Sequence, residues 1–322
     1  MVNINVVVVG DSWANASEVV ASLKKHNGQK INLDFGSEAP DLIRLGVMSV
    51  ILKHISDLTT ITISGWLNPV QALPVKNTAP AQKYNHFFYA DYITSHNTEI
   101  NANLKYLFGL FVGRRTISRC LILYEVFHLF DSQSFLSLME YSYSYPWNTS
   151  NTVDVERLDD WVDQTQQSNF KNWWIQPPIS SVDQCNVADQ YTKERDTNQS
   201  LLSYYKNFSI EIVCETFCYG NTFFPTEKTI RPISACKPFL VFGPVNFLSR
   251  LRDIGFKTFD SFWDETYDSF EGKPRWELIK ETLVYIKQKA FTNDAFLDDL
   301  SKITKHNQKL LHAIKSNHRA HY

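Results

Sequence analysis

Short apolar runs alternate along the chain with polar turns and amphipathic stretches, which is the pattern that predicts an α/β protein. Near the start, the run Ile4 to Val9 contains four consecutive valines and predicts a buried parallel strand. We expect a helix from about Ala16 to His26 and a second strand from Lys30 to Phe35. This order of strand, turn, helix and strand is typical of the opening of a Rossmann-like domain.

The same pattern restarts further along the chain. An apolar run at Leu107 to Val112 predicts a strand, followed by a helix from Ile117 to Leu129 and a strand from Phe135 to Tyr141. Two such openings predict two α/β domains. A stretch rich in Asn, Gln, Ser and Asp interrupts the second, and we expect its tryptophans to tether it to the domain. The expected division is residues 1–100, residues 101–300 with an insertion at about 146–206, and a C-terminal helix at 301–322.

A third strand–helix–strand unit carries a trio of charged residues at the start of its helix. Ile210 to Val213 predicts a buried strand, and Thr226 stands at the N-cap position of a short helix that ends near Ala235. A strand from Pro238 to Phe242 follows. The N-terminus of a helix offers free N–H groups and a positive dipole end to an anion. The charged residues at or just after this N-terminus are Glu227, Lys228 and Arg231.

The residues of this unit resemble a known family. Glu215, then Phe224-Pro-Thr-Glu-Lys, then a strand from Pro238 to Gly243, are similar to the donor-site motif of the α-1,3-fucosyltransferases, F-E-N, Y-[IV]-T-E-K and P-[IV]-x-x-G. The longer run T-E-K-T-x-[KR]-P-I, with G-F-K-T-F and D-E-x-Y-D, resembles uncharacterised glycosyltransferase-like proteins of phages and large viruses more closely still. The likeness implies two Rossmann-like domains facing a cleft, the GT-B arrangement, and transfer of a sugar from a nucleotide-diphosphate sugar to an acceptor hydroxyl.

The resemblance also implies roles for individual residues. A departing nucleoside diphosphate gains negative charge, which Lys228 and Arg114 are suited to neutralise. Glu227, at the glutamate of T-E-K, is expected to accept hydrogen bonds from sugar or ribose hydroxyls. A carboxylate of the first domain takes the acceptor proton, with Glu38 preferred and Asp11 as the second choice. The expected donor-binding residues are Arg114, Arg119, Glu215, Thr226, Glu227, Lys228 and Arg231, and the expected catalytic residues are Glu38 and Asp11.

Metal-dependent transfer is not expected. No two aspartates stand two residues apart, so the metal-binding D-x-D of the other glycosyltransferase fold is missing. We therefore expect no metal and no cofactor, only a nucleotide-sugar substrate, with a GDP-sugar preferred. The resemblance implies inversion at the anomeric carbon. Because Cys214-Glu-Thr216 stands where the family has F-E-N, the sequence leaves the sugar and the base open.

Three other functions stay open. Transfer to modified bases of viral DNA is disfavoured by a net charge of −2, since nucleic-acid binding draws on basic residues. A non-catalytic sugar-binding or interaction protein on the same scaffold is disfavoured by the retained T-E-K and arginines. An SGNH esterase is suggested by Gly10-Asp-Ser12, but no Asp is followed by a His three residues later. The absence of G-x-G-x-x-G argues against a dinucleotide cofactor.

Cysteines and hydropathy bear on location. The five cysteines form no C-x-x-C pair, which favours free thiols in a reducing compartment over disulfides or a metal site. Met1 leads almost directly into the first predicted strand, leaving no room for a signal peptide, and no apolar run approaches the ~20 residues of a membrane span. The sequence therefore predicts a cytoplasmic protein whose partners are a nucleotide sugar and a glycan or other hydroxyl acceptor.

Overall fold

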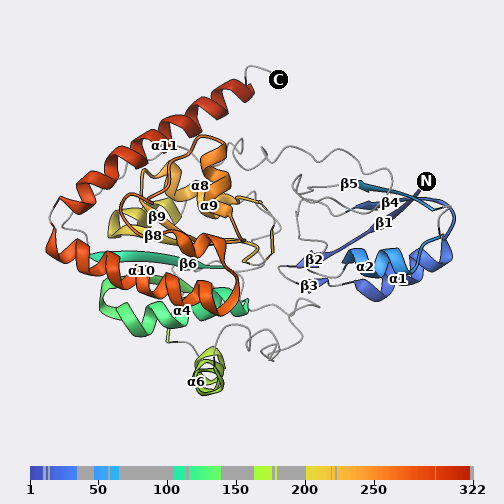
Figure 1. The fold of residues 1–322 in the computed structure, drawn as a ribbon, viewed down its shortest axis with the longest axis horizontal. Helices are drawn as coiled ribbons and strands as arrows, with labels where there is room; N and C mark the ends of the chain where they lie inside the picture. The colour runs from blue at the N-terminus through green and yellow to red at the C-terminus, as the bar shows by residue number, and fades with distance from the viewer. Residues whose placement is uncertain are drawn as a thin grey trace. The chain divides into compact units, whose positions relative to one another are not determined.

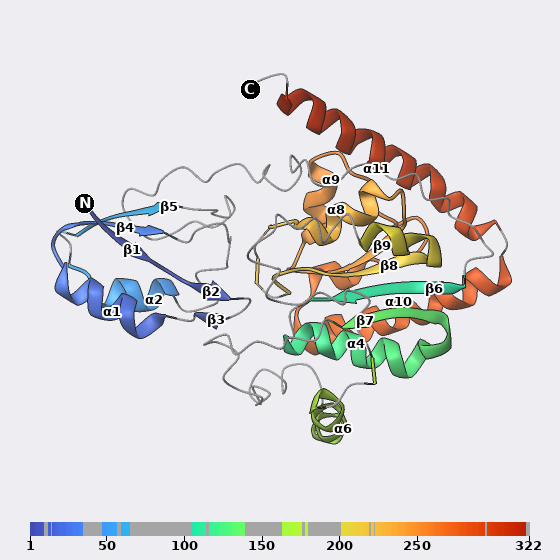
Figure 2. The same cartoon turned by 180° about the vertical axis from the view of Figure 1, so that it is seen from behind.

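The chain folds into two compact units, each of mixed α/β structure with a parallel sheet, in a computed structural model (Figures 1 and 2). Unit 1 comprises Met1–His86 and Tyr219–Phe224, and unit 2 comprises Phe87–Cys218 and Pro225–Tyr322. The residues that the structure describes are 1–9, 12–13, 15–34, 47–56, 59–64, 105–113, 116–138, 163–175, 178–179, 201–218, 220–221, 223–293 and 295–319.

Unit 1 contains a three-stranded parallel sheet in the order β1-β4-β5 and a two-stranded antiparallel pair, β2-β3. Val19 and Leu23 of α1 are buried, as are Ile31 and Leu33 of β4, so the helix and the sheet share one core. The elements are β1 (Val2–Asn5), β2 (Val8–Val9), β3 (Ser12–Trp13), α1 (Ala16–Lys25), β4 (Lys30–Asp34), α2 (Val47–Lys53) and β5 (Thr60–Ser64).

The predicted helix at 16–26 and the strand at 30–35 are confirmed, but the prediction of one strand over Ile4 to Val9 is wrong. The parallel ladder with β4 ends at Asn5, and Val6 makes one further bond, from its N–H to the carbonyl of Asp34 at 2.8 Å. The amide of Asn15 then intervenes: its Oδ1 accepts from the N–H of Val7 and its Nδ2 donates to the carbonyl of Asn5, both at 2.9 Å. A side chain thus takes backbone bonds that would have continued the strand.

Unit 2 is built on a four-stranded parallel sheet in the order β7-β6-β8-β9. The strands are β6 (Tyr106–Val112), β7 (Ser134–Leu138), β8 (Phe208–Cys214) and β9 (Phe239–Phe242). The helices are α4 (Ile117–Phe130), α6 (Gln164–Ile175), α8 (Glu227–Ser234), α9 (Phe247–Asp253), α10 (Gly272–Thr292) and α11 (Phe296–Arg319), with short 3-10 turns η1 (Asp131–Gln133), η3 (Ser203–Asn207) and η4 (Thr266–Ser269). The strands predicted at 107–112, 210–213 and 238–242 and the helix predicted at 117–129 lie within two residues of their observed bounds. The C-terminal helix predicted at 301–322 begins earlier, at Phe296, and the end of the strand predicted at 135–141 lies outside the described residues.

The strand order places a reversal of winding between β6 and β8. The crossover through α4 leads from β6 to β7 on one side, and the crossover through α8 leads from β8 to β9 on the other. Since such crossovers are right-handed, α4 and α8 cover opposite faces of the sheet. In doubly wound sheets, ligands bind outside the carboxyl ends of the strands at this reversal.

Aromatic rings fill the core beside β6 and β8. Phe208 is fully buried, and its ring packs against those of Phe111 and Tyr205 at centroid distances of 5.8 and 5.0 Å. Gly109 of β6 leaves the space that this ring occupies, since a Cβ there would lie 2.5 Å from ring atoms of Phe208. Trp173 of α6 is also buried, with its ring 5.5 Å from that of Tyr124 on α4, which confirms a tethering role for this tryptophan of the insertion.

Candidate functional site

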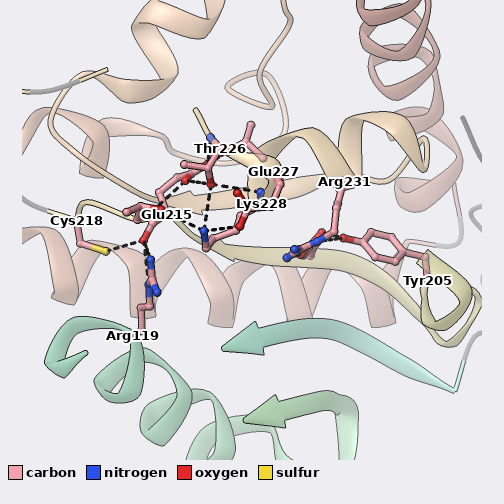
Figure 3. A network of polar contacts seen from close by, with 11 residues as sticks. Arg119, Tyr205, Glu215, Cys218, Thr226, Glu227, Lys228 and Arg231 are labelled. Carbon is pink, nitrogen blue, oxygen red and sulfur yellow. Dashed lines mark hydrogen bonds and ion pairs between the residues drawn. The ribbon is translucent and has the colours of Figure 1, made fainter. Parts of the chain in front are cut away.

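The candidate site lies at the carboxyl ends of β6 and β8, where the winding of the unit 2 sheet reverses. Glu215 follows β8 directly, and its fully buried carboxylate accepts hydrogen bonds from four donors around the start of α8 (Figure 3). Two are the backbone N–H groups of Thr216 and Thr226, both at 3.1 Å, and two are the hydroxyls of Thr226 and Thr229. Glu215 thereby fixes the loop after β8 to the first turn of α8.

Glu215 replaces the glutamate of an ordinary capping box. In that motif the residue at the third helical position accepts from the N–H of the N-cap residue. Here that position is Thr229, and the carboxylate that accepts from Thr226 comes from 11 residues earlier in the chain. The prediction that Thr226 caps α8 is confirmed, since its side chain accepts from the N–H of Lys228 at 3.3 Å.

The sequence had predicted that the N–H groups at the start of this helix are free to bind an external anion. The N–H groups of Thr226 and Lys228 are instead already bonded within the protein. The N–H groups of Thr229 and Ile230 are bonded as well, both to the carbonyl of Thr226 at 3.2 Å. A helix N-terminus favours a negative charge, and Glu215 already supplies one from within the protein. A ligand phosphate at this edge cannot use these four N–H groups without displacing their present partners.

Among the charged residues around Glu215, Lys228 and Glu227 are the ones whose side chains are not buried; they are 15% and 26% exposed respectively. The ammonium of Lys228 donates to Glu227 Oε1 at 2.7 Å, to Thr216 Oγ1 at 3.1 Å and to Thr226 Oγ1 at 3.2 Å. Burial acts to raise the pKa of Glu227, but the charges of Lys228 and Arg231 outweigh it and lower the pKa to about 2. The site therefore presents a fixed ion pair, with its carboxylate ionised at neutral pH.

Arg119 belongs to the site but is directed at the backbone. It lies in the first turn of α4 and is buried, and its Nε and Nη2 donate to the carbonyl of Glu215 at 3.1 and 2.9 Å. These bonds join segments 96 residues apart, on the two sides of the winding reversal. Arg119 therefore positions the loop that carries Glu215 (Figure 3).

Arg231 lies away from the start of α8, which the sequence had not predicted. It is buried in the last turn of the helix, with Nη2 3.6 Å from Glu211 Oε1 and Nε donating to the hydroxyl of Tyr205 at 3.3 Å. Tyr205 in turn donates to Glu211. These three residues thus form a polar cluster inside the core. Through this cluster Arg231 holds α8 against the core of unit 2.

The remaining predicted site residues are Arg114, Glu38 and Asp11, and all three lie outside the described residues. Sequence reasoning missed the roles of Thr216 and Thr229, which hold Lys228 and Glu215. A signal for Thr229 was present, because it stands three residues after the N-cap, where a capping partner is expected.

The D-E-x-Y-D motif has a structural role. The carboxylate of Asp268 accepts from the N–H groups of Leu248 and Ser249 at the start of α9, at 3.0–3.2 Å. Glu265 accepts from the N–H of Phe259 at 2.8 Å and from Arg252 at 2.9 Å. These acids hold α9 and the loop after it in place, so in this chain the motif stabilises the fold of unit 2.

The free energy of unfolding is expected to fall as the pH rises from about 4.5 to about 7. Burial raises the pKa of Glu211 from its ordinary 4.5 to about 7, and burial likewise raises that of Glu265 to about 7. The unfolded chain loses these protons at lower pH than the folded chain, so within this window the folded state binds more protons. Raising the pH therefore favours unfolding.

Urea unfolding at several pH values measures this slope. Glu211→Gln removes one titrating group and is expected to flatten the profile, whereas the exposed Glu277→Gln serves as a matched control. A wild-type profile that is flat or rises through this window contradicts the assignment of raised pKa values.

The chain matches no known protein family, and no curated protein shows significant sequence similarity to it. Function therefore has to be inferred from the residues of the site. Within the described part of the chain, no group of three or more His, Cys, Asp and Glu side chains is placed to hold a metal ion. None of the helices found there combines the length and apolar character required to cross a bilayer.

Proposed function

We propose that this chain is a glycosyltransferase that moves a sugar from a nucleotide-diphosphate sugar to an acceptor hydroxyl. The observation that carries the proposal is the ion pair of Glu227 and Lys228, held at the carboxyl edge of a doubly wound sheet beside the reversal of winding. Crevices at this place in open α/β sheets are where nucleotides bind.

The two partly exposed side chains, Lys228 and Glu227, divide the task of binding a donor. Lys228 shares two of its N–H donors with threonine hydroxyls, which are neutral acceptors. Phosphate oxygens are charged acceptors and form stronger bonds, so a diphosphate displaces these hydroxyls. Glu227 is ionised and accepts from hydroxyls of the sugar or ribose. Buried hydrogen bonds between Thr226 and Glu215 fix the first turn of α8. The ion pair of Glu227 and Lys228 is therefore organised before the ligand binds.

The resemblance to T-E-K donor motifs supports the same assignment. The proposal includes metal-independent, inverting transfer, with Arg114 as a second cation at the diphosphate. It also includes a carboxylate of unit 1, Glu38 or Asp11, as the base that takes the acceptor proton. Proton removal by a positioned carboxylate makes the acceptor hydroxyl a better nucleophile.

Lys228→Ala is expected to weaken nucleotide-sugar binding about 10- to 150-fold, which corresponds to the ~1.5–3 kcal/mol of one charge-assisted hydrogen bond. A thermal-shift panel of GDP-, UDP-, ADP- and CMP-sugars first identifies the donor, because a ligand at a hundredfold excess over Kd adds about 2.7 kcal/mol of stability. Calorimetric titration then compares the wild type with Lys228→Ala and Glu227→Gln.

Lys280→Ala is the matched control, since Lys280 is 18% exposed and pairs with Glu277 at 2.8 Å, much as Lys228 pairs with Glu227. It should leave donor binding unchanged. If no nucleotide sugar stabilises the wild type, or if Lys228→Ala and Glu227→Gln bind the donor as tightly as it does, the proposed function is wrong.

A further inference from the structure

A cavity of about 560 Å³ lies in unit 2 between the loop after α9 and the first turns of α11. This volume is in the range of small-molecule sites. The charged side chains that line it are those of Arg252, Lys257, Asp260, Asp299 and Lys302, and Thr258 and Ser261 add hydroxyl groups.

The cavity lies at the edge of the sheet opposite the candidate donor site. The loop follows α9, which leads away from the carboxyl end of β9, and Phe259 in this loop packs its ring 5.3 Å from that of Phe239, the first residue of β9. Glu227 and Lys228 begin α8 at the carboxyl edge. A ligand in the cavity therefore occupies a different place from a donor bound at α8.

Side chains from two helices hold the cavity wall in one conformation. Asn307 of α11 is buried and bonds the backbone of Lys257 in both directions, accepting from its N–H at 2.7 Å and donating to its carbonyl at 2.8 Å. Arg252 at the end of α9 donates to Thr258 Oγ1 at 2.6 Å and to Glu265 Oε2 at 2.9 Å. The backbone of the loop is thus preorganised, which lowers that part of the entropy cost of binding, while the charged side chains around the cavity are exposed to solvent.

The lining combines groups suited to two parts of one ligand. Lys257 and Lys302 bring two positive charges and Arg252, which also pairs with Glu265, a third; these are the residue types that bind phosphate. Asp260 and Asp299 bring two carboxylates, which accept from hydroxyl groups. Lys302 Nζ lies 3.4 Å from Asp299 Oδ1, so positive and negative side chains are mixed around the cavity. A simple anion uses only the first set, whereas a polyhydroxylated phosphate uses both.

We propose that this cavity is a second ligand site that binds a small sugar phosphate. The phosphate lies against Arg252, Lys257 and Lys302, and the sugar hydroxyls face Asp260 and Asp299. This site is separate from the proposed donor site and goes beyond the proposed function.

Calorimetric titration of the full chain with glucose 6-phosphate, inorganic phosphate and glucose tests the proposal. The wild type should bind glucose 6-phosphate more tightly than either simpler probe. The double variant Lys257→Ala, Lys302→Ala should weaken that binding at least about tenfold, the effect of one lost charge-assisted hydrogen bond. Asp260→Asn should weaken the binding of glucose 6-phosphate while leaving that of inorganic phosphate unchanged.

Lys305→Ala provides the matched control, because Lys305 is an exposed lysine on α11 that does not line the cavity. The thermal shift with nucleotide sugars is expected to be the same in the double variant and the wild type. The proposal for the cavity is therefore tested independently of the proposed donor site. The proposal is overturned if glucose 6-phosphate binds no more tightly than inorganic phosphate, or if the double variant binds it as the Lys305→Ala control does.

Discussion

Glu215→Ala is expected to lower the free energy of unfolding by about 3–5 kcal/mol, because four donors lose their acceptor at once. Two are backbone N–H groups and two are threonine hydroxyls, around a carboxylate that is fully buried. Each buried donor left without a partner costs about 1–3 kcal/mol, and the loop and helix relax to recover part of that cost.

Urea unfolding of Glu215→Ala beside Glu277→Ala measures this effect. Glu277 is 44% exposed and pairs with Lys280, so its removal should cost less than about 1 kcal/mol. Glu215→Gln keeps one acceptor oxygen and should lie between the two. A Glu215→Ala variant as stable as Glu277→Ala would show that this carboxylate does not organise the site.

Asp268→Ala is expected to destabilise unit 2 by a similar amount, about 3–5 kcal/mol, because it breaks a buried ion pair. Arg275 is fully buried, and its Nη2 lies 3.7 Å from Asp268 Oδ1. Asp268 also caps α9 through the N–H groups of Leu248 and Ser249. The substitution removes the cap and the carboxylate that compensates a buried guanidinium.

A double variant separates the two contributions. Asp268→Asn keeps an acceptor oxygen for the start of α9 but leaves the charge of Arg275 uncompensated, so it should be strongly destabilising. Adding Arg275→Met removes that charge with little change of volume, and stability should return toward the wild type. Chemical unfolding of the single and double variants measures the coupling. If the second change adds to the damage, the charge of Arg275 is not the source of the cost.

The elements of unit 2 were predictable because their signals are local. Thr226 could be identified as an N-cap from the residues beside it, and the apolar runs of β6 and β8 are continuous. The interruption of the strand predicted at 4–9 could not be predicted. The parallel ladder ends where the side-chain amide of Asn15 accepts a hydrogen bond from the backbone of Val7. Propensity favours a strand through four valines, and a side-chain contact from elsewhere decides otherwise.

The sequence grouped Glu215, Thr226, Glu227 and Lys228, which the structure brings together, but it did not predict what each side chain contacts. The resemblance to a donor-site motif, together with charge and position, suggested that Glu215, Arg119 and Arg231 would bind a donor. Their side chains instead face the protein, through contacts that span 11 to 96 residues of sequence for Glu215 and Arg119. No local pattern reveals which charged side chain of a motif turns inward. Exposure, which depends on the whole fold, distinguishes Glu227 and Lys228 from their supports.

The close approach of Gly109 and Phe208 ties two distant positions of the sequence to each other. A side chain at 109 would collide with the Phe208 ring, and the ring is held by its neighbours Phe111 and Tyr205. A substitution at position 109 or at position 208 is therefore expected to be tolerated only when the other position changes with it. Among descendants of this sequence, a residue larger than glycine at 109 should appear only together with a smaller residue at 208. The two positions should therefore covary.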